Sequence, residues 1–124
     1  MLTAHSPAGT QVTITLRQLI THLSGIRTTT EADVMHDWEF RITNSTQTVA
    51  FFAADPLLFK PGSRFYYSNS GWNLIGAIVE AVENRSYDLL IREYMHYQLG
   101  MEHSLMDTRF ELVPHRASNY RVPL

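Results

Sequence analysis

Residues 59–80 are the stretch from which the fold can be inferred, and they run FKPGSRFYYSNSGWNLIGAIVE. Pro61-Gly62 is a turn signal, because proline fixes its own φ and glycine tolerates positive φ. The aromatic residues 65–67 are typical of a short strand. The polar corner Tyr67-Ser68-Asn69 comes next, and residues 70–82 then carry apolar side chains at helical spacing. We therefore expect a tyrosine and an asparagine on a loop between two rigid elements, where catalytic and binding residues often lie.

Helical spacing dominates the rest of the chain. Leucines and isoleucines recur three and four residues apart over residues 13–23, with Thr15 placed as N-cap and Gly25 placed just beyond the helix end. Further helices are expected from residue 31 onward, over 44–54, over 70–82 and over 87–99, the last ending at Gly100. The buried face of the helix over 70–82 is expected to hold Trp72, Ile75, Ile78, Val79 and Val82.

The two ends of the chain give weaker patterns. Residues 1–12 are predicted to be a polar, poorly ordered lead-in, and a short strand is possible over 116–122. The 124 residues allow one domain at most. The predicted fold class is therefore mostly α, with about five helices and little strand.

Composition excludes several classes of function. A net charge of −2 with scattered arginines gives no electrostatic basis for binding nucleic acid. The absence of cysteine rules out disulfides and thiol catalysis, and the six histidines form no recognisable ligand cluster, so no metal is predicted. No apolar run approaches the ~18 residues of a membrane span, and the N-terminus does not read as a secretory signal.

The corner at residues 67–69 resembles the Tyr-x-Asn motif of class C β-lactamases and related penicillin-binding-protein-like serine hydrolases. Residues 13–26 resemble the segment T-I-R-x-L-L-x-H-x-S-G-I of that family, residues 55–62 resemble its D-P-L-L-F-x-P-G approach, and residues 99–101 resemble its L-G-M. The order and spacing of all four agree, so the resemblance covers residues 13–106 of a partial β-lactamase-related domain spanning 1–124. Within the family, the chain is most similar to the animal mitochondrial β-lactamase-like proteins, which implies a mitochondrial location.

The resemblance implies a fold and a chemistry. The chain would be a helical subdomain fragment of the α/β serine β-lactamase/transpeptidase-like fold. Relatives cleave amide or ester bonds of peptides or small molecules through an acyl-enzyme and use no cofactor. By resemblance, Tyr67 is the proton shuttle. Asn69 orients the general-base lysine and the substrate, although it is also well placed to cap the following helix.

The nucleophile motif of that family, Ser-x-x-Lys, is absent from this sequence. The one lysine is Lys60, and the residue three before it is Leu57. The third family motif, Lys-Thr-Gly or a His-x-Gly variant, is absent too, and Lys60-Pro61-Gly62 is interpreted as a turn. The chain alone is therefore expected to be inactive in acyl transfer.

Other polar residues have structural interpretations. His22 is predicted to be buried or structural rather than a catalytic base, and Ser24 is predicted to end a helix rather than act as a nucleophile. Ser68 is given no catalytic role. Phe65 and Trp72 are expected in the core rather than as a platform for substrate.

Two alternatives to the hydrolase fragment remain open. The chain could be a non-catalytic interaction or assembly module, because the animal mitochondrial relatives self-assemble into filaments. It could also be a truncated gene product without an independent function. A module should be soluble and fold cooperatively, whereas a severed fragment would expose apolar surface and aggregate.

Overall fold

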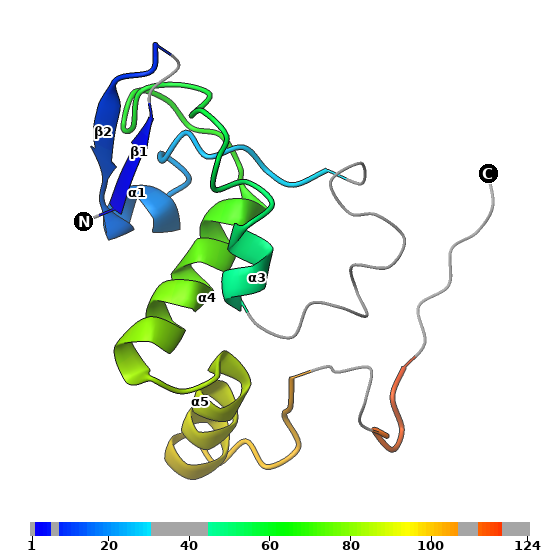
Figure 1. Ribbon diagram of the computed structural model, residues 1–124. Coiled ribbons are helices and arrows are strands. Elements are labelled where there is room, and N and C mark those ends of the chain that lie inside the picture. Colours follow the sequence, from blue (N-terminus) through cyan, green and yellow to red (C-terminus); the bar gives the residue numbers. More distant parts are fainter. Residues whose placement is uncertain (1, 6–7, 31–44, 107–111, 118–124) are drawn as a thin grey trace, which may run out of the picture. The chain divides into compact units, whose positions relative to one another are not determined.

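The computed structural model describes residues 2–5, 8–30, 45–106 and 112–117 (Figure 1). The chain divides into two compact units, residues 1–90 and 91–124, and each is described by itself. The helix expected from residue 31 and most of the strand expected over 116–122 lie outside the described residues. None of the helices that the structure describes is long and apolar enough to cross a membrane.

The first unit begins with a β-hairpin, so the prediction of a poorly ordered lead-in over residues 1–12 was wrong. Strand β1 (Leu2–His5) pairs antiparallel with β2 (Gln11–Ile14), with Leu2 opposite Ile14 and His5 opposite Gln11. Ile14 is buried in the core, and Ala4 and Val12 pack against it. Each strand has four residues and so only two positions per face, which is too short an alternation to stand out in the sequence.

Helix α1 (Leu16–Ile20) follows the hairpin directly. Thr15 is its N-cap, as predicted, and it forms a capping box in which its Oγ1 accepts the Gln18 amide while Gln18 accepts the Thr15 amide. The helix ends three residues earlier than expected. His22, with φ of 59°, takes the left-handed position after the C-cap Thr21 that the sequence had assigned to Gly25.

Helix α4 (Asn69–Glu83) is the longest element of the first unit and packs against both α1 and the short helix α3 (Ser45–Val49) (Figure 1). The predicted span of α4 was nearly right, whereas α3 gives way to turns well before Ala54. The predicted buried face of α4 was partly wrong. Trp72 and Val82 are 48% and 76% exposed, and Leu74 joins Ile75 and Ile78 against the core.

The core of the first unit joins the hairpin, α1 and the loop after α3. Its buried side chains are Ile14, Leu19, Ile26, Phe52 and Leu57. The segment that follows α1 runs beside residues 57–66, because the Leu58 amide donates to the Gly25 carbonyl, the Gly62 amide to the Leu23 carbonyl and the Tyr66 amide to the His22 carbonyl. This pairing fixes where the chain enters α4.

The Glu80 carboxylate joins two helix starts. Its Oε2 accepts the Ser45 amide at the beginning of α3 (3.3 Å), and its Oε1 accepts the amide of Tyr87, the first residue of helix α5 (Tyr87–Glu93) (2.9 Å). Carboxylates are favourable at helix N-termini, where backbone amides lack partners within the helix.

Glu80→Ala is therefore expected to lower the free energy of unfolding by about 2 kcal/mol, because two amides lose a charged acceptor. Chemical denaturation followed by circular dichroism measures it. Glu83→Ala is the matched control, because it removes the same charge from an exposed position of the same helix. Equal losses in the two variants would contradict the bridging role of Glu80.

The second unit starts within α5. The α-helical geometry changes to a π-helical turn, η1 (Tyr94–Gln98), in which the Leu99 amide donates to the Tyr94 carbonyl. The prediction of one helix over 87–99 was therefore right in extent and wrong in geometry. The helix ends at Gly100, as expected, and the Met101 amide then donates to the Met95 carbonyl.

Candidate functional site

The corner between the aromatic stretch and α4 alternates between exposed and buried side chains. Tyr67 is 59% exposed and Asn69 is exposed, whereas Ser68 and Ser70 are 1% and 0% exposed. Tyr67 and Asn69 therefore face outward, while the two serines are buried and anchor the backbone. The two predicted site residues thus lie on the same corner.

Ser68, and not Asn69, is the N-cap of α4. Its backbone is extended (φ −140°, ψ 112°), and its Oγ accepts the Gly71 amide at 3.1 Å. The same hydroxyl donates to the Arg27 carbonyl at 3.1 Å. The sequence offers two good caps side by side, and the second bond to Arg27 favours the serine. The side chain of Asn69 is thereby free of the capping role.

The segment 27–29 runs beside residues 68–70 and forms a hydrogen bond with each of them. The Thr29 amide donates to the buried Ser70 Oγ at 2.9 Å, and the Asn69 amide donates to Thr28 Oγ1 at 3.3 Å. With the Ser68 bond to Arg27, three consecutive residues of one segment bind three consecutive residues of the other. The backbone under Tyr67 and Asn69 is therefore fixed by tertiary contacts.

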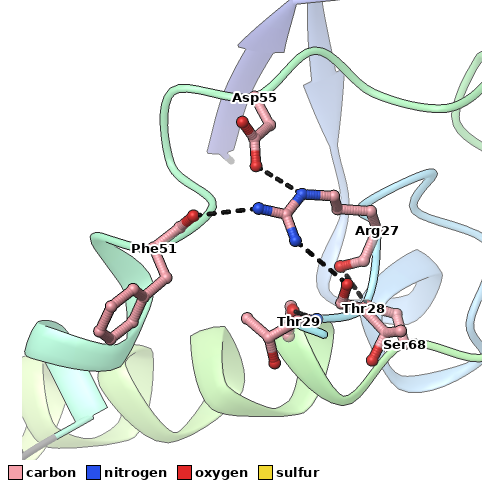
Figure 2. Close-up of polar contacts among 7 residues, drawn as sticks. Arg27, Thr28, Thr29, Phe51, Asp55 and Ser68 are labelled. Carbon is pink, nitrogen blue, oxygen red and sulfur yellow. Dashed lines mark hydrogen bonds and ion pairs between the residues drawn. The ribbon is translucent and has the colours of Figure 1, made fainter. Parts of the chain in front are cut away.

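Arg27 ties this segment to the loop after α3, as Figure 2 shows. Its Nε donates to Asp55 Oδ2 at 2.6 Å in an ion pair, and its guanidinium also donates to the Phe51 carbonyl and to the Thr28 carbonyl, both at 3.2 Å. Both partners of the ion pair are half-buried. These contacts fix the backbone of Arg27, whose carbonyl accepts the hydrogen bond from the Ser68 hydroxyl.

His22 is a member of the site that the sequence did not assign to it. Its half-buried ring lies 4.7 Å from the ring of Tyr67, tilted by 39°, and 5.7 Å edge-on from that of Phe65. It also receives the Ser68 amide and the Trp72 indole N–H. The prediction that His22 is structural agrees with these contacts. The histidine within the family-like segment 13–26 was the signal that could have placed it beside Tyr67.

The aromatic residues around His22 are more exposed than predicted. Phe65 and Trp72 were expected in the core, yet both are exposed, because their rings gather around His22 at the surface. Ser24, by contrast, is buried, and its Oγ accepts the Ile26 amide. The prediction that Ser24 ends a helix was wrong, because α1 already ends at Ile20 with Thr21 as its C-cap.

The corner presents groups that can move a proton and orient a polar ligand. A phenol both donates and accepts one hydrogen bond, and an amide side chain offers a donor and an acceptor together. A separate cavity of about 160 Å³ lies under the hairpin, lined by Ala4, Ile14, Phe52 and Leu57 among others. Its lining includes neither Tyr67 nor Asn69. Among the described residues, no group of three or more metal-ligating side chains gathers.

Ser68→Ala is expected to lower the free energy of unfolding by about 2 kcal/mol, because it removes the α4 cap and leaves the Arg27 carbonyl without its donor. Asn69→Ala is the matched control and should change stability by less than about 0.5 kcal/mol. Urea denaturation of both variants measures the difference. A larger loss for Asn69→Ala would mean that the asparagine is the cap.

The comparisons with known proteins agree on one class. The backbone matches a penicillin-binding protein from Bacillus halodurans with a TM-score of 0.72 and 27% sequence identity, over 80% of this chain and 31% of that one. The matched part of the chain thus has the β-lactamase and penicillin-binding-protein type of fold. The model of the Beta-lactamase family matches residues 3–123, so the chain belongs to the β-lactamase family.

Two curated relatives show the breadth of that family. Protein flp from Staphylococcus aureus is 30% identical over 115 residues, which is 92% of this chain and 22% of flp. The mouse serine beta-lactamase-like protein LACTB, described as mitochondrial, is 34% identical over 80 residues, which is 64% of this chain and 14% of LACTB. The chain thus spans about a fifth or less of the length of these relatives, which include a bacterial protein and a mitochondrial one.

Proposed function

We propose that this chain forms the helical wall of the active site of a β-lactamase-like serine hydrolase. In this proposal Tyr67 and Asn69 are the Tyr-x-Asn motif, and the substrate is a peptide or a small amide or ester. The observation that carries it is the corner itself. Tyr67 and Asn69 project outward from a backbone held by the buried Ser68 and Ser70.

The proposed chemistry assigns a separate task to each outward side chain. A serine attacks the substrate carbonyl carbon, the serine oxygen–carbon bond forms, and the serine proton must leave. The Tyr67 oxygen, paired with a lysine amine, accepts that proton and returns one to the leaving nitrogen or oxygen as its bond to carbon breaks. The Asn69 amide donates to a substrate carbonyl and accepts from the lysine. Water then releases the acyl group by the reverse proton path.

The serine and the lysine of this scheme are not supplied by a Ser-x-x-Lys motif in the 124 residues. We propose that they belong to a further part of the fold. In support of this, the chain covers only a small share of the length of the proteins it matches. The mostly helical character of the chain is part of the same proposal. In it, the chain supplies the β1–β2 hairpin, and the main sheet of the domain is formed by the further part of the fold. A mitochondrial location is also part of this proposal. The similarity to mammalian LACTB supports that location, whereas the similarity to staphylococcal flp does not.

Intact-mass measurement after incubation with a fluorophosphonate and, separately, with benzylpenicillin tests this assignment. The 124-residue chain is expected to gain no covalent adduct. A polypeptide that joins it to a Ser-x-x-Lys segment of the same fold should gain one, on the serine of that segment. A stable adduct on the chain alone would contradict the proposal, because its chemistry needs the missing nucleophile.

A non-catalytic assembly module is the second candidate. The exposed aromatic side chains Phe65, Tyr67 and Trp72 favour it, because such rings are common in protein interfaces. Sedimentation velocity over a range of concentrations separates the two. Reversible self-association that Trp72→Ala abolishes would support a module, and a monomer at all concentrations would contradict it.

A further inference from the structure

His22 lies where three segments of the first unit meet. Its carbonyl accepts the Tyr66 amide at 2.9 Å, which holds the aromatic stretch. Its Nδ1 receives the Ser68 amide at 3.2 Å, and its Nε2 receives the Trp72 indole N–H at 3.3 Å. One residue thus contacts the chain before, at and after the Tyr67–Asn69 corner.

The two donors compete for one ring. A neutral imidazole has one acceptor nitrogen and carries a hydrogen on the other, and an imidazolium has no acceptor at all. The ring is therefore neutral in this arrangement, and it accepts from either Ser68 or Trp72 at any moment. Which donor it serves decides the tautomer.

Burial favours the Ser68 amide. Ser68 is 1% exposed and precedes α4, so its amide takes no part in the hydrogen bonds of the helix and cannot turn to water. Trp72 is 48% exposed, so its indole N–H can bond to solvent instead. Leaving a buried donor without an acceptor is much less favourable than leaving an exposed one to water.

We propose that His22 is the positioning residue of the Tyr67–Asn69 corner, acting as a neutral imidazole with its hydrogen on Nε2 and the Ser68 amide bonded to Nδ1. In that state one face of the fixed ring supports the Tyr67 ring at 4.7 Å, while the Nδ1 bond holds the backbone between Tyr67 and Asn69. The importance of this for catalysis rests on the proposed function, but the tautomer and the contacts do not.

The tautomer is directly measurable on the native 124-residue chain. A long-range ¹H–¹⁵N correlation spectrum of the histidine rings should show His22 as the Nε2–H form. Trp72→Phe removes the competing donor and should leave that form unchanged. The Nδ1–H form in the native chain, or a tautomer that changes in Trp72→Phe, would overturn the proposal, because the Trp72 indole would then determine the tautomer of His22.

Two substitutions separate the nitrogens. In His22→Asn the amide oxygen lies near the place of Nδ1, and asparagine tolerates the left-handed backbone at φ of 59°. In His22→Gln the amide oxygen reaches toward the place of Nε2. Hydrogen exchange of the Ser68 amide should stay within about threefold of the native rate in His22→Asn and rise about tenfold or more in His22→Gln. Equal rates in both variants would overturn the assignment of Nδ1.

The Tyr67 ring reports the second half of the role. Both substitutions remove the imidazole face, so the aromatic proton signals of Tyr67 should shift in both, even where the Ser68 amide stays protected. Unchanged Tyr67 signals would overturn the claim that His22 positions that ring. None of these measurements needs acyl transfer, so a failure of the proposed function would leave their outcome unaffected.

Discussion

Gly25→Ala is expected to be strongly destabilising, lowering the free energy of unfolding by about 3 kcal/mol or more. Gly25 has φ of +83°, a conformation that costs other residues about 1–2 kcal/mol. An added Cβ would also lie 2.5 Å from the carbonyl oxygen of Phe59, which is backbone and has little room to yield. Overpacking of this kind typically costs a further 1–3 kcal/mol.

Gly9→Ala is the matched control for this prediction. Gly9 has φ of +78°, but an added Cβ there would meet nothing within 4 Å. It should therefore lose only the conformational part, about 1 kcal/mol. Thermal unfolding of both variants measures the difference, which should exceed 5 °C. Equal losses would mean that the contact with Phe59 relaxes without cost.

The position of Gly25 gives this substitution a consequence beyond stability. Its carbonyl accepts the Leu58 amide, while the nearby carbonyls of His22 and Arg27 accept the Tyr66 amide and the Ser68 hydroxyl. A shift of the two segments would therefore displace Ser68 and, with it, Tyr67 and Asn69. Loss of Ser68 amide protection in a Gly25→Ala chain that still folds would report that displacement.

Tyr67→Phe is expected to have the largest effect on activity. In a longer polypeptide that contains this chain together with the nucleophile, it should lower the rate of acylation by about 10²–10⁴-fold, the usual contribution of a general acid–base group. The phenyl ring keeps the contact with His22 and loses only the hydroxyl, so stability should change by less than about 0.5 kcal/mol. Stopped-flow acylation with a chromogenic β-lactam or ester measures the rate.

Tyr66→Phe controls for the loss of a tyrosine hydroxyl at this place in the chain. Tyr66 is the neighbouring residue and is also exposed. Its substitution should leave the acylation rate within about twofold of the native rate. A fall in rate equal to that of Tyr67→Phe would contradict the assignment of the proton shuttle to Tyr67.

The sequence alone predicted the features that depend on local pattern. The Thr15 cap and the approximate span of α4 could be predicted from the sequence, because they depend on residues within one or two helical turns. The family could be predicted as well, because four motifs typical of it occur in the expected order across residues 13–106. The roles of Tyr67 and Asn69 in chemistry stay predictions.

The features that failed depend on contacts between distant segments. Ser68 rather than Asn69 caps α4 because the Arg27 carbonyl lies within reach of its hydroxyl, and nothing near residue 68 in the sequence shows that. Trp72 leaves the predicted buried stripe of α4 because it contacts His22, fifty positions earlier. The hairpin was missed because its strands are stabilised by packing against distant segments. Its inward side chains are buried against α1 and the loop after α3, which local sequence does not show.

The pairing of residues 27–29 with residues 68–70 also sets when the corner forms during folding. The bonds that hold it join positions 41 apart in the sequence, so a long loop has to close before any of them is made. Contacts of high sequence separation form slowly compared with helices and turns. A synthetic peptide of residues 59–80 should therefore form part of α4 at most and leave Tyr67 and Asn69 without a fixed geometry. The orientation of the candidate catalytic side chains is thus acquired late, as a property of the folded unit rather than of the motif.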